Sequence, residues 1–248
     1  MRDKLKNKEY FEKKYNFHLN SYKKEFEEIK KEFEELKGKY PYDTIEDSLG
    51  GYYYGIFLSG FKTFYAGYSI GMEVEELKPI GEGLLYGLYK RCKWKDYLSF
   101  EDTRVVLIFI IILNIKTEYV GKFIKLIRKN ELEDRYIDHL INYIYEKEEI
   151  KSKEILFKKR EKTVMEVVDL AKQGKKDEAT KILKKYLEKQ WLNMQDDQCI
   201  LDKKAHLKDI YVGYWCIEAV ALVKMYDLDD EILKECDYYP YELAHFEG

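Results

Sequence analysis

In the first forty residues, apolar and charged positions recur with the period of an α-helix. Between Lys4 and Lys37, apolar or aromatic residues recur mostly at spacings of three and four: Leu5, Tyr10, Phe11, Tyr15, Leu19, Tyr22, Phe26, Ile29, Phe33 and Leu36. This stripe, opposed by lysine and glutamate, predicts one long amphipathic helix that ends at Gly38 and Pro41. Its charged face is expected to be solvated. A coiled-coil arm is the alternative, but the heptad repeat is irregular.

Beyond this helix, the apolar positions form a series of shorter helical segments. The aromatic and glycine-rich stretch 52–91 is expected to hold two helices that are separated at Pro79. Ser99, followed by Asp102, is expected to cap a helix containing the longest apolar run, Val105 to Leu113. Further helices are predicted over 118–128, 132–147, 211–226 and 229–236. Residues 164–191 are predicted to form a helical hairpin that turns at Gly174.

The sequence therefore predicts an all-α fold. With only 3 prolines and 14 glycines, the chain lacks the many turns that a β-sandwich or barrel needs. We expect a multi-helix bundle of antiparallel helices, with a long N-terminal helix and helical hairpins in the C-terminal half. The lysine- and glutamate-rich stretch 146–160 is the predicted boundary between an N-terminal helical domain, 1–148, and a C-terminal helical domain, 149–248, packed on the first.

Composition narrows the class of protein further. Hydrophobic residues make up 46% of the chain and the net charge is only -3, which argues against a disordered polyelectrolyte and against a dedicated nucleic-acid binder. The four cysteines, Cys92, Cys199, Cys216 and Cys236, form no CxxC pair and are expected to be reduced thiols. The charged N-terminus leads into no apolar signal segment, and the longest apolar run is too short to span a membrane. We expect a cytoplasmic protein.

Charge is distributed unevenly along the chain. Residues 196–248 hold 13 acidic and 5 basic side chains, whereas residues 1–195 have a small basic surplus. Such an acidic segment is a candidate docking surface for a basic partner. The candidate partner-binding residues are Asp196, Asp197, Asp202, Asp227, Asp229, Asp230, Glu231, Glu235 and Asp237.

None of the side-chain patterns that accompany catalysis or metal binding is complete. His206 has Asp202 and Asp209 at helical spacings, but two or three such groups do not close a metal site by themselves. Glu242 and His245 match the Glu-x-x-His element of di-iron bundles, without the second copy that those sites need. Asp229 and Asp230 are interpreted as carboxylates at a helix N-terminus. We predict no catalytic residue, no metal, no cofactor and no enzymatic activity.

Two glutamates lie in otherwise apolar, aromatic stretches. Glu73 follows Tyr68 to Met72, and Glu218 follows Trp215 to Ile217. A carboxylate that faces a core must be paired or hydrogen-bonded, and Arg104 or a tyrosine hydroxyl is the expected partner. A functional acid in a cleft is the alternative.

These stretches also belong to an ordered set of short motifs that resembles a known family. The set comprises Arg2-Asp3-x-Leu5, Glu9-Tyr10-Phe11, Tyr68-Ser69-x-Gly71 with Glu73, Tyr211-x-Gly213-Tyr214-Trp215-x-x-Glu218-Ala219, Asp229-Asp230, Tyr238-Tyr239-Pro240 and Leu243. In this order the motifs resemble the PoNi immunity proteins, which protect bacteria from PoNe-type DNase toxins. The resemblance spans nearly the whole chain, and its C-terminal part is the most specific.

The resemblance implies an all-helical protein that binds a cognate nuclease toxin and has no enzymatic activity. It implies no catalytic residue, and the motif residues have the character of scaffold: Tyr68, Gly71, Glu73, Gly213, Tyr214, Trp215, Glu218, Tyr239 and Pro240. We expect no direct nucleic-acid or membrane binding, and either a monomer or a homodimer. Two other classes stay open: a helical scaffold that binds a different protein, and a helical-bundle enzyme that uses Glu73, Glu218 and His206.

Overall fold

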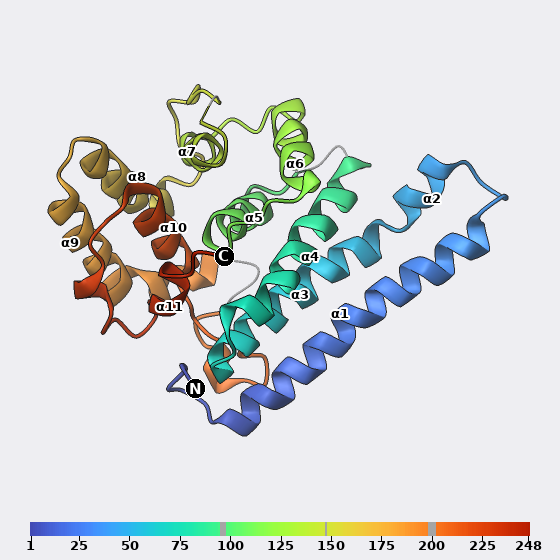
Figure 1. Cartoon of the computed structure of the whole chain (residues 1–248), viewed down its shortest axis with the longest axis horizontal. Coiled ribbons are helices and arrows are strands. Elements are labelled where there is room, and N and C mark those ends of the chain that lie inside the picture. The colour runs from blue at the N-terminus through green and yellow to red at the C-terminus, as the bar shows by residue number, and fades with distance from the viewer. Residues whose placement is uncertain (95–97, 147, 198–201) are drawn as a thin grey trace. The chain divides into compact units, whose positions relative to one another are not determined.

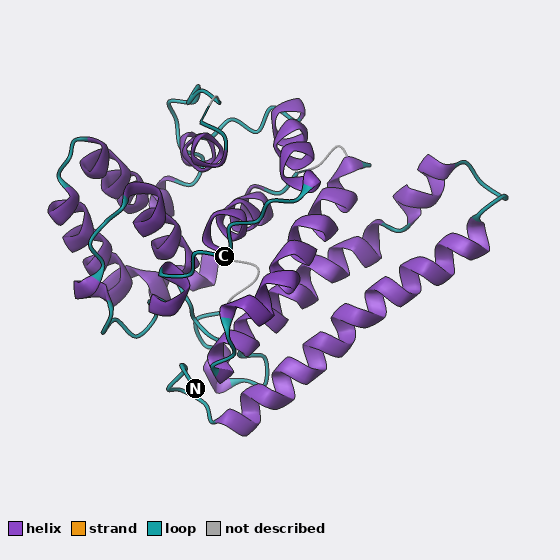
Figure 2. Ribbon diagram, viewed as in Figure 1, coloured by secondary structure: helices purple, strands orange, loops and turns teal. Residues whose placement is uncertain are grey.

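The structure is a computed structural model that describes residues 1–94, 98–146, 148–197 and 202–248, without the side chains of Arg160 and residues 195–197. In this part of the chain every regular element is a helix, which confirms the predicted all-α fold (Figures 1 and 2). The α-helices are α1 (Lys8–Leu36), α2 (Tyr42–Ser48), α3 (Gly50–Ile70), α4 (Val74–Lys93), α5 (Phe100–Ile112), α6 (Glu118–Lys129), α7 (Arg135–Ile144), α8 (Lys158–Lys172), α9 (Lys176–Tyr186), α10 (Ile217–Tyr226) and α11 (Tyr241–Ala244).

The chain divides into two compact units. Unit 1 consists of Met1–Val106 and Ile115–Leu132, and unit 2 consists of Leu107–Asn114 and Glu133–Gly248. Each unit has its own buried apolar residues. The division into domains at residue 148 that the sequence suggests stays a prediction.

Unit 1 is built on three long helices, α1, α3 and α4, which lie side by side in Figure 1. The long N-terminal helix that the sequence predicts is present as α1, and the Asn7 side chain caps it by accepting a hydrogen bond from the Tyr10 N–H at 2.9 Å. Close approach of α3 and α4 depends on Gly87. A Cβ placed there would lie 2.7 Å from the Tyr53 carbonyl oxygen.

The prediction that Pro79 separates two helices is wrong. The break comes at Gly71, which has a left-handed φ of 104° and ends α3, while the Met72 N–H returns to the Gly67 carbonyl. Gly71 adopts this conformation without the steric penalty that a Cβ would bring. Pro79 lies inside α4, where the helix continues despite the missing N–H donor.

The signals for the next helix are confirmed. The Ser99 Oγ accepts a hydrogen bond from the Asp102 N–H at 3.3 Å, and the run Val105 to Leu113 is buried throughout. Unit 2 contains the predicted hairpin as α8 and α9, which turn at Gly174 with a φ of 77°. Its predicted seam is buried and consists of Ala171, Ala179, Leu183 and Leu187.

The last apolar segment is only partly helical. The sequence predicts a helix over 211–226, but α10 begins at Ile217. Residues 211–216 are buried without being helical, because Gly213 has a φ of 125° and the Cys216 N–H donates to the Tyr238 carbonyl at 2.8 Å. An apolar pattern reports burial here rather than a helix. We call residues 211–216 the buried strap.

Candidate interaction surface

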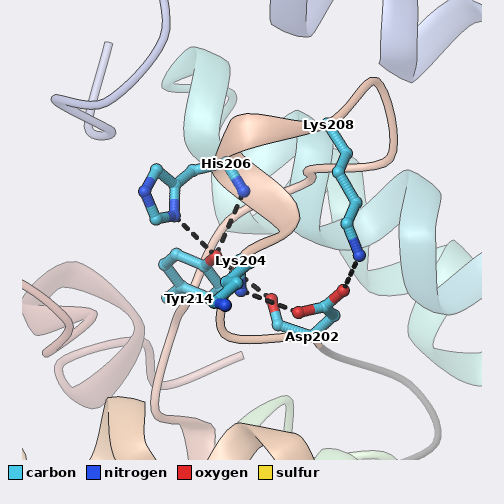
Figure 3. A network of polar contacts seen from close by, with 5 residues as sticks. All are labelled: Asp202, Lys204, His206, Lys208 and Tyr214. Carbon is cyan, nitrogen blue, oxygen red and sulfur yellow. Dashed lines mark hydrogen bonds and ion pairs between the residues drawn. The ribbon is translucent and has the colours of Figure 1, made fainter.

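The buried strap contacts a surface loop of unit 2 through the hydroxyl of Tyr214. Tyr214, which is 1% exposed, donates a hydrogen bond to the Asp202 carbonyl at 3.1 Å and accepts one from the His206 N–H at 3.1 Å (Figure 3). The same hydroxyl lies 2.9 Å from Nδ1 of His206. Burial raises the pKa of Tyr214, so that its hydroxyl stays protonated and donates. His206 and Asp202, which lie four positions apart in the sequence, therefore both contact the Tyr214 hydroxyl.

The Asp202 carboxylate, at the edge of this loop, forms an ion pair and a hydrogen bond within the chain. It pairs with the Lys208 ammonium and accepts a hydrogen bond from the Lys204 N–H at 2.7 Å (Figure 3). These two contacts, that with Lys208 first, lower the pKa of Asp202. Asp202 consequently offers less free charge to a partner than its place in the acidic segment suggests.

The other predicted acidic residues differ in their exposure. Asp227 is exposed at the C-terminal end of α10 and pairs with Lys176 at 3.0 Å. Asp230 is only 6% exposed. The acidic residues with exposed side chains near the short 3-10 helix η4 (Glu231–Leu233) are Asp229, Glu231, Glu235 and Asp237. The side chains of Asp196 and Asp197 lie outside the described residues, as does Cys199.

Two of the exposed carboxylates line a groove of about 370 Å³ in unit 2. One wall comes from the π-helix η1 (Leu187–Trp191) and from the start of the 3-10 helix η2 (Leu192–Asp197), and the other comes from residues 235–238. We call this the acidic groove. It is lined by Leu187, Glu188, Lys189, Leu192, Asn193, Glu235, Cys236, Asp237 and Tyr238.

Sequence reasoning missed Glu188 as part of this surface. The residue lies in the predicted hairpin, 47 positions before Glu235, and belongs to the segment with a small basic surplus. Its position in the groove depends on the π-helical turn that continues α9, for which the apolar pattern contains no signal.

Comparison with protein families identifies part of unit 2. Residues 132–243 match the model of a family described as PoNe immunity proteins (PoNi), C-terminal. This part of the chain is similar to the C-terminal region of the PoNi immunity proteins. Comparisons with curated proteins and with solved structures gave no match.

The PoNi match covers the motifs that we expected to be scaffold in unit 2. Glu218 is fully buried, and its carboxylate accepts a hydrogen bond from the Tyr186 hydroxyl at 2.9 Å. The expected tyrosine partner is thus present. Gly213, Trp215, Tyr239 and Pro240 are buried as well.

Asp230, which the sequence analysis interprets as a carboxylate at a helix N-terminus, makes different contacts in the structure. Its carboxylate makes no helix cap; it accepts a hydrogen bond from the Tyr239 hydroxyl at 2.5 Å and lies 3.2 Å from Nε2 of His245. Burial and this carboxylate raise the pKa of Tyr239. Asp230 therefore links Tyr239 and His245 in the C-terminal region.

The N-terminal motifs lie outside the matched residues, in unit 1, and pack against each other. The Arg2 guanidinium lies 4.3 Å from the centroid of the Tyr68 ring and donates to the Met72 carbonyl at 2.7 Å. Glu73 is exposed at the N-cap of α4, so it is not the core-facing carboxylate that its apolar neighbours suggested. The turn at Gly71 carries the chain out of the core just before this residue.

The structure adds two observations on chemistry that apply to its described residues only. No three or more His, Cys, Asp or Glu side chains among them are grouped in a way that could hold a metal ion. None of the helices in the described ranges is both long and apolar enough to cross a lipid bilayer.

Proposed function

We propose that this chain is an immunity protein that binds and neutralises a cognate DNase toxin of the PoNe type. The observation that carries the proposal is the match of residues 132–243 to the PoNi family. The chain acts by occupying a surface of the toxin, and it contributes no catalytic group and no cofactor.

Charge complementarity supports this function. A nuclease binds the phosphate backbone of DNA through lysine and arginine side chains. The exposed carboxylates around η4 present the opposite charge to such a surface. Complementary surfaces of this kind accelerate association, from about 10⁵–10⁶ M⁻¹ s⁻¹ for neutral partners to as much as about 10⁸–10⁹ M⁻¹ s⁻¹ at low salt.

The test is to purify the chain together with a PoNe-type DNase and to measure both the complex and DNA cleavage. We expect a stable complex in size-exclusion chromatography with light scattering, and cleavage that falls to background at a stoichiometric ratio. Light scattering also reports whether the free chain is a monomer or a homodimer. Unchanged cleavage and no complex would refute the proposal and leave a scaffold for another protein as the better hypothesis.

A charge-reversal pair tests the contribution of the acidic surface. Glu231→Lys/Glu235→Lys reverses two exposed side chains near η4, and Glu27→Lys/Glu35→Lys makes the same change in charge on the exposed face of α1. At about 50 mM salt we expect the first pair to slow association more than tenfold and the control pair to slow it much less. Equal effects of both pairs would show that only net charge matters.

A further inference from the structure

We infer that the acidic groove receives an arginine side chain of the bound nuclease and so forms the anchor of the complex. The inference rests on the proposed function for the identity of the partner. It goes further because it assigns the contact to one pocket and to one kind of partner side chain, whereas net charge alone does not distinguish one part of the acidic surface from another.

Carboxylates outnumber cations in the lining of the groove. Glu188, Glu235 and Asp237 contribute three carboxylates, whereas Lys189 is the one cation among its lining residues. Lys184 offsets Glu188 only partly, because its ammonium is 3.9 Å away and both side chains are more than 40% exposed. The half-buried Cys236 thiol responds to this charge: burial, then Glu188, raise its pKa.

The carboxylates come from two separate segments of the groove lining. Glu188 belongs to η1, and Glu235 and Asp237 belong to the segment that follows η4. A cation that enters the groove therefore meets carboxylates from both segments. Arginine fits this arrangement better than lysine does, because its planar fork pairs with more than one carboxylate oxygen and remains charged at every physiological pH.

The remaining lining residues suit the faces and the stem of a guanidinium side chain. The partly exposed Leu192 supplies aliphatic surface, and Tyr238 supplies an aromatic ring. Arginine buries its methylene stem against apolar surface and stacks its guanidinium on aromatic rings. The volume of about 370 Å³ lies at the lower end of ligand pockets, which favours one or two long side chains over a whole helix.

Both walls of the groove are tied to the buried strap. The Trp191 Nε1–H at the end of η1 donates to the Tyr214 carbonyl at 2.6 Å, and the Tyr238 carbonyl accepts from the Cys216 N–H at 2.8 Å. Trp191 is 2% exposed, and the ring of Tyr186 packs beside it. The width of the groove is thus fixed before binding, and a preformed pocket loses little conformational entropy when it is filled.

The first experiment removes groove charge without changing shape. Glu188→Gln/Glu235→Gln neutralises one carboxylate on each wall, and Glu166→Gln/Glu178→Gln is the control, since it removes two exposed charges from α8 and α9 outside the groove lining. With a purified PoNe-type DNase we expect the groove pair to weaken binding at least about 30-fold, mainly through faster dissociation, and the control pair to weaken it less than about threefold. Equal effects, or no effect of the groove pair on a complex that still forms, would overturn the inference and leave the proposed function intact.

A second variant fills the groove without altering its charge. Asn193→Trp places a large ring at the lining of η2, and its thermal midpoint reports whether the fold is retained. We expect a folded protein that has lost affinity for the DNase to the same degree as the charge pair. A folded Asn193→Trp protein with unchanged affinity would count against the groove.

A small-molecule probe separates this inference from the proposed function. In NMR titrations of the free chain, blocked arginine (N-acetyl-arginine amide) is expected to shift the resonances of residues 187–193 and 235–238 at millimolar concentration, and to do so more than blocked lysine does. Such shifts in a chain that binds no nuclease would sustain the groove as an arginine pocket while refuting the proposed partner. Absence of these shifts, or equal shifts with lysine, would overturn the preference for arginine.

Discussion

Replacement of Gly87 by alanine tests the packing of α3 against α4. The added Cβ would lie 2.7 Å from the Tyr53 carbonyl oxygen and 3.0 Å from Cγ2 of Ile56. The carbonyl belongs to helix α3, so it cannot rotate away as a flexible side chain would. Overpacking of this kind costs about 1–3 kcal/mol, whereas the higher helix propensity of alanine returns up to about 1 kcal/mol.

Gly51→Ala provides the control for helix propensity. Gly51 is also helical, but a Cβ at this position would have no neighbouring atom within 4 Å. The difference in unfolding free energy between the two variants therefore isolates the clash and is expected to be about 1–3 kcal/mol. In a chain of this size that corresponds to about 2–12 °C in the thermal midpoint.

Thermal and urea unfolding, followed by circular dichroism, would measure this difference. Because the chain has two compact units, the transitions must first be tested for two-state behaviour, and the signal of unit 1 must be followed separately if they are not. Equal stability of Gly87→Ala and Gly51→Ala would refute the close approach of α3 and α4 at Gly87.

Two further predictions concern unit 2. Burial, followed by the charges of Lys172 and Arg135, lowers the pKa of His139 from 6.5 to about 4, so the unfolded chain binds more protons than the folded chain between these pH values. We therefore expect the wild type to lose stability relative to His139→Gln as the pH falls from 6.5 to about 4. If urea unfolding gave the same pH dependence of stability for both proteins, this prediction would be wrong. Tyr214→Phe removes the hydroxyl that hydrogen-bonds to the Asp202 carbonyl and the His206 N–H. We expect the His206 amide hydrogen to exchange at least about tenfold faster in this variant, while the exchange rates of the α10 amides stay unchanged. Equal exchange rates at His206 in the variant and the wild type would show that the hydroxyl does not hold the loop.

The parts of the fold that depend on local chemistry could be predicted from the sequence. The apolar period of α1, the Ser99 cap and the turn at Gly174 are each determined by residues a few positions apart. The errors arise where two signals compete. Pro79 looked like a stronger helix breaker than Gly71, but a left-handed glycine ends a helix completely, whereas a proline removes one hydrogen bond and lets the helix continue.

The candidate site was less accessible to sequence reasoning because it depends on contacts that are distant along the chain. Charge counting located the acidic segment and included Glu235 and Asp237 in it. It could not distinguish these exposed carboxylates from Asp230, which accepts a hydrogen bond from Tyr239, or from Asp202, which forms an ion pair with Lys208. Nor could it add Glu188, which lies in the π-helical turn that Trp191 joins to the buried strap.

The arrangement of unit 2 separates the residues that hold the acidic groove in place from those that are exposed in it. The strap residues Tyr214 and Cys216 fix the two walls of the groove through their backbone atoms, and the Glu218 carboxylate is tied to Tyr186 just before η1 begins. Glu188 and Glu235 are exposed on these fixed walls. If the groove binds a basic side chain as we infer, exchange of such surface residues would change which side chain it accepts while the strap keeps its geometry. Under the proposed function, a scaffold of this design would let recognition change from one toxin to another without a change of fold.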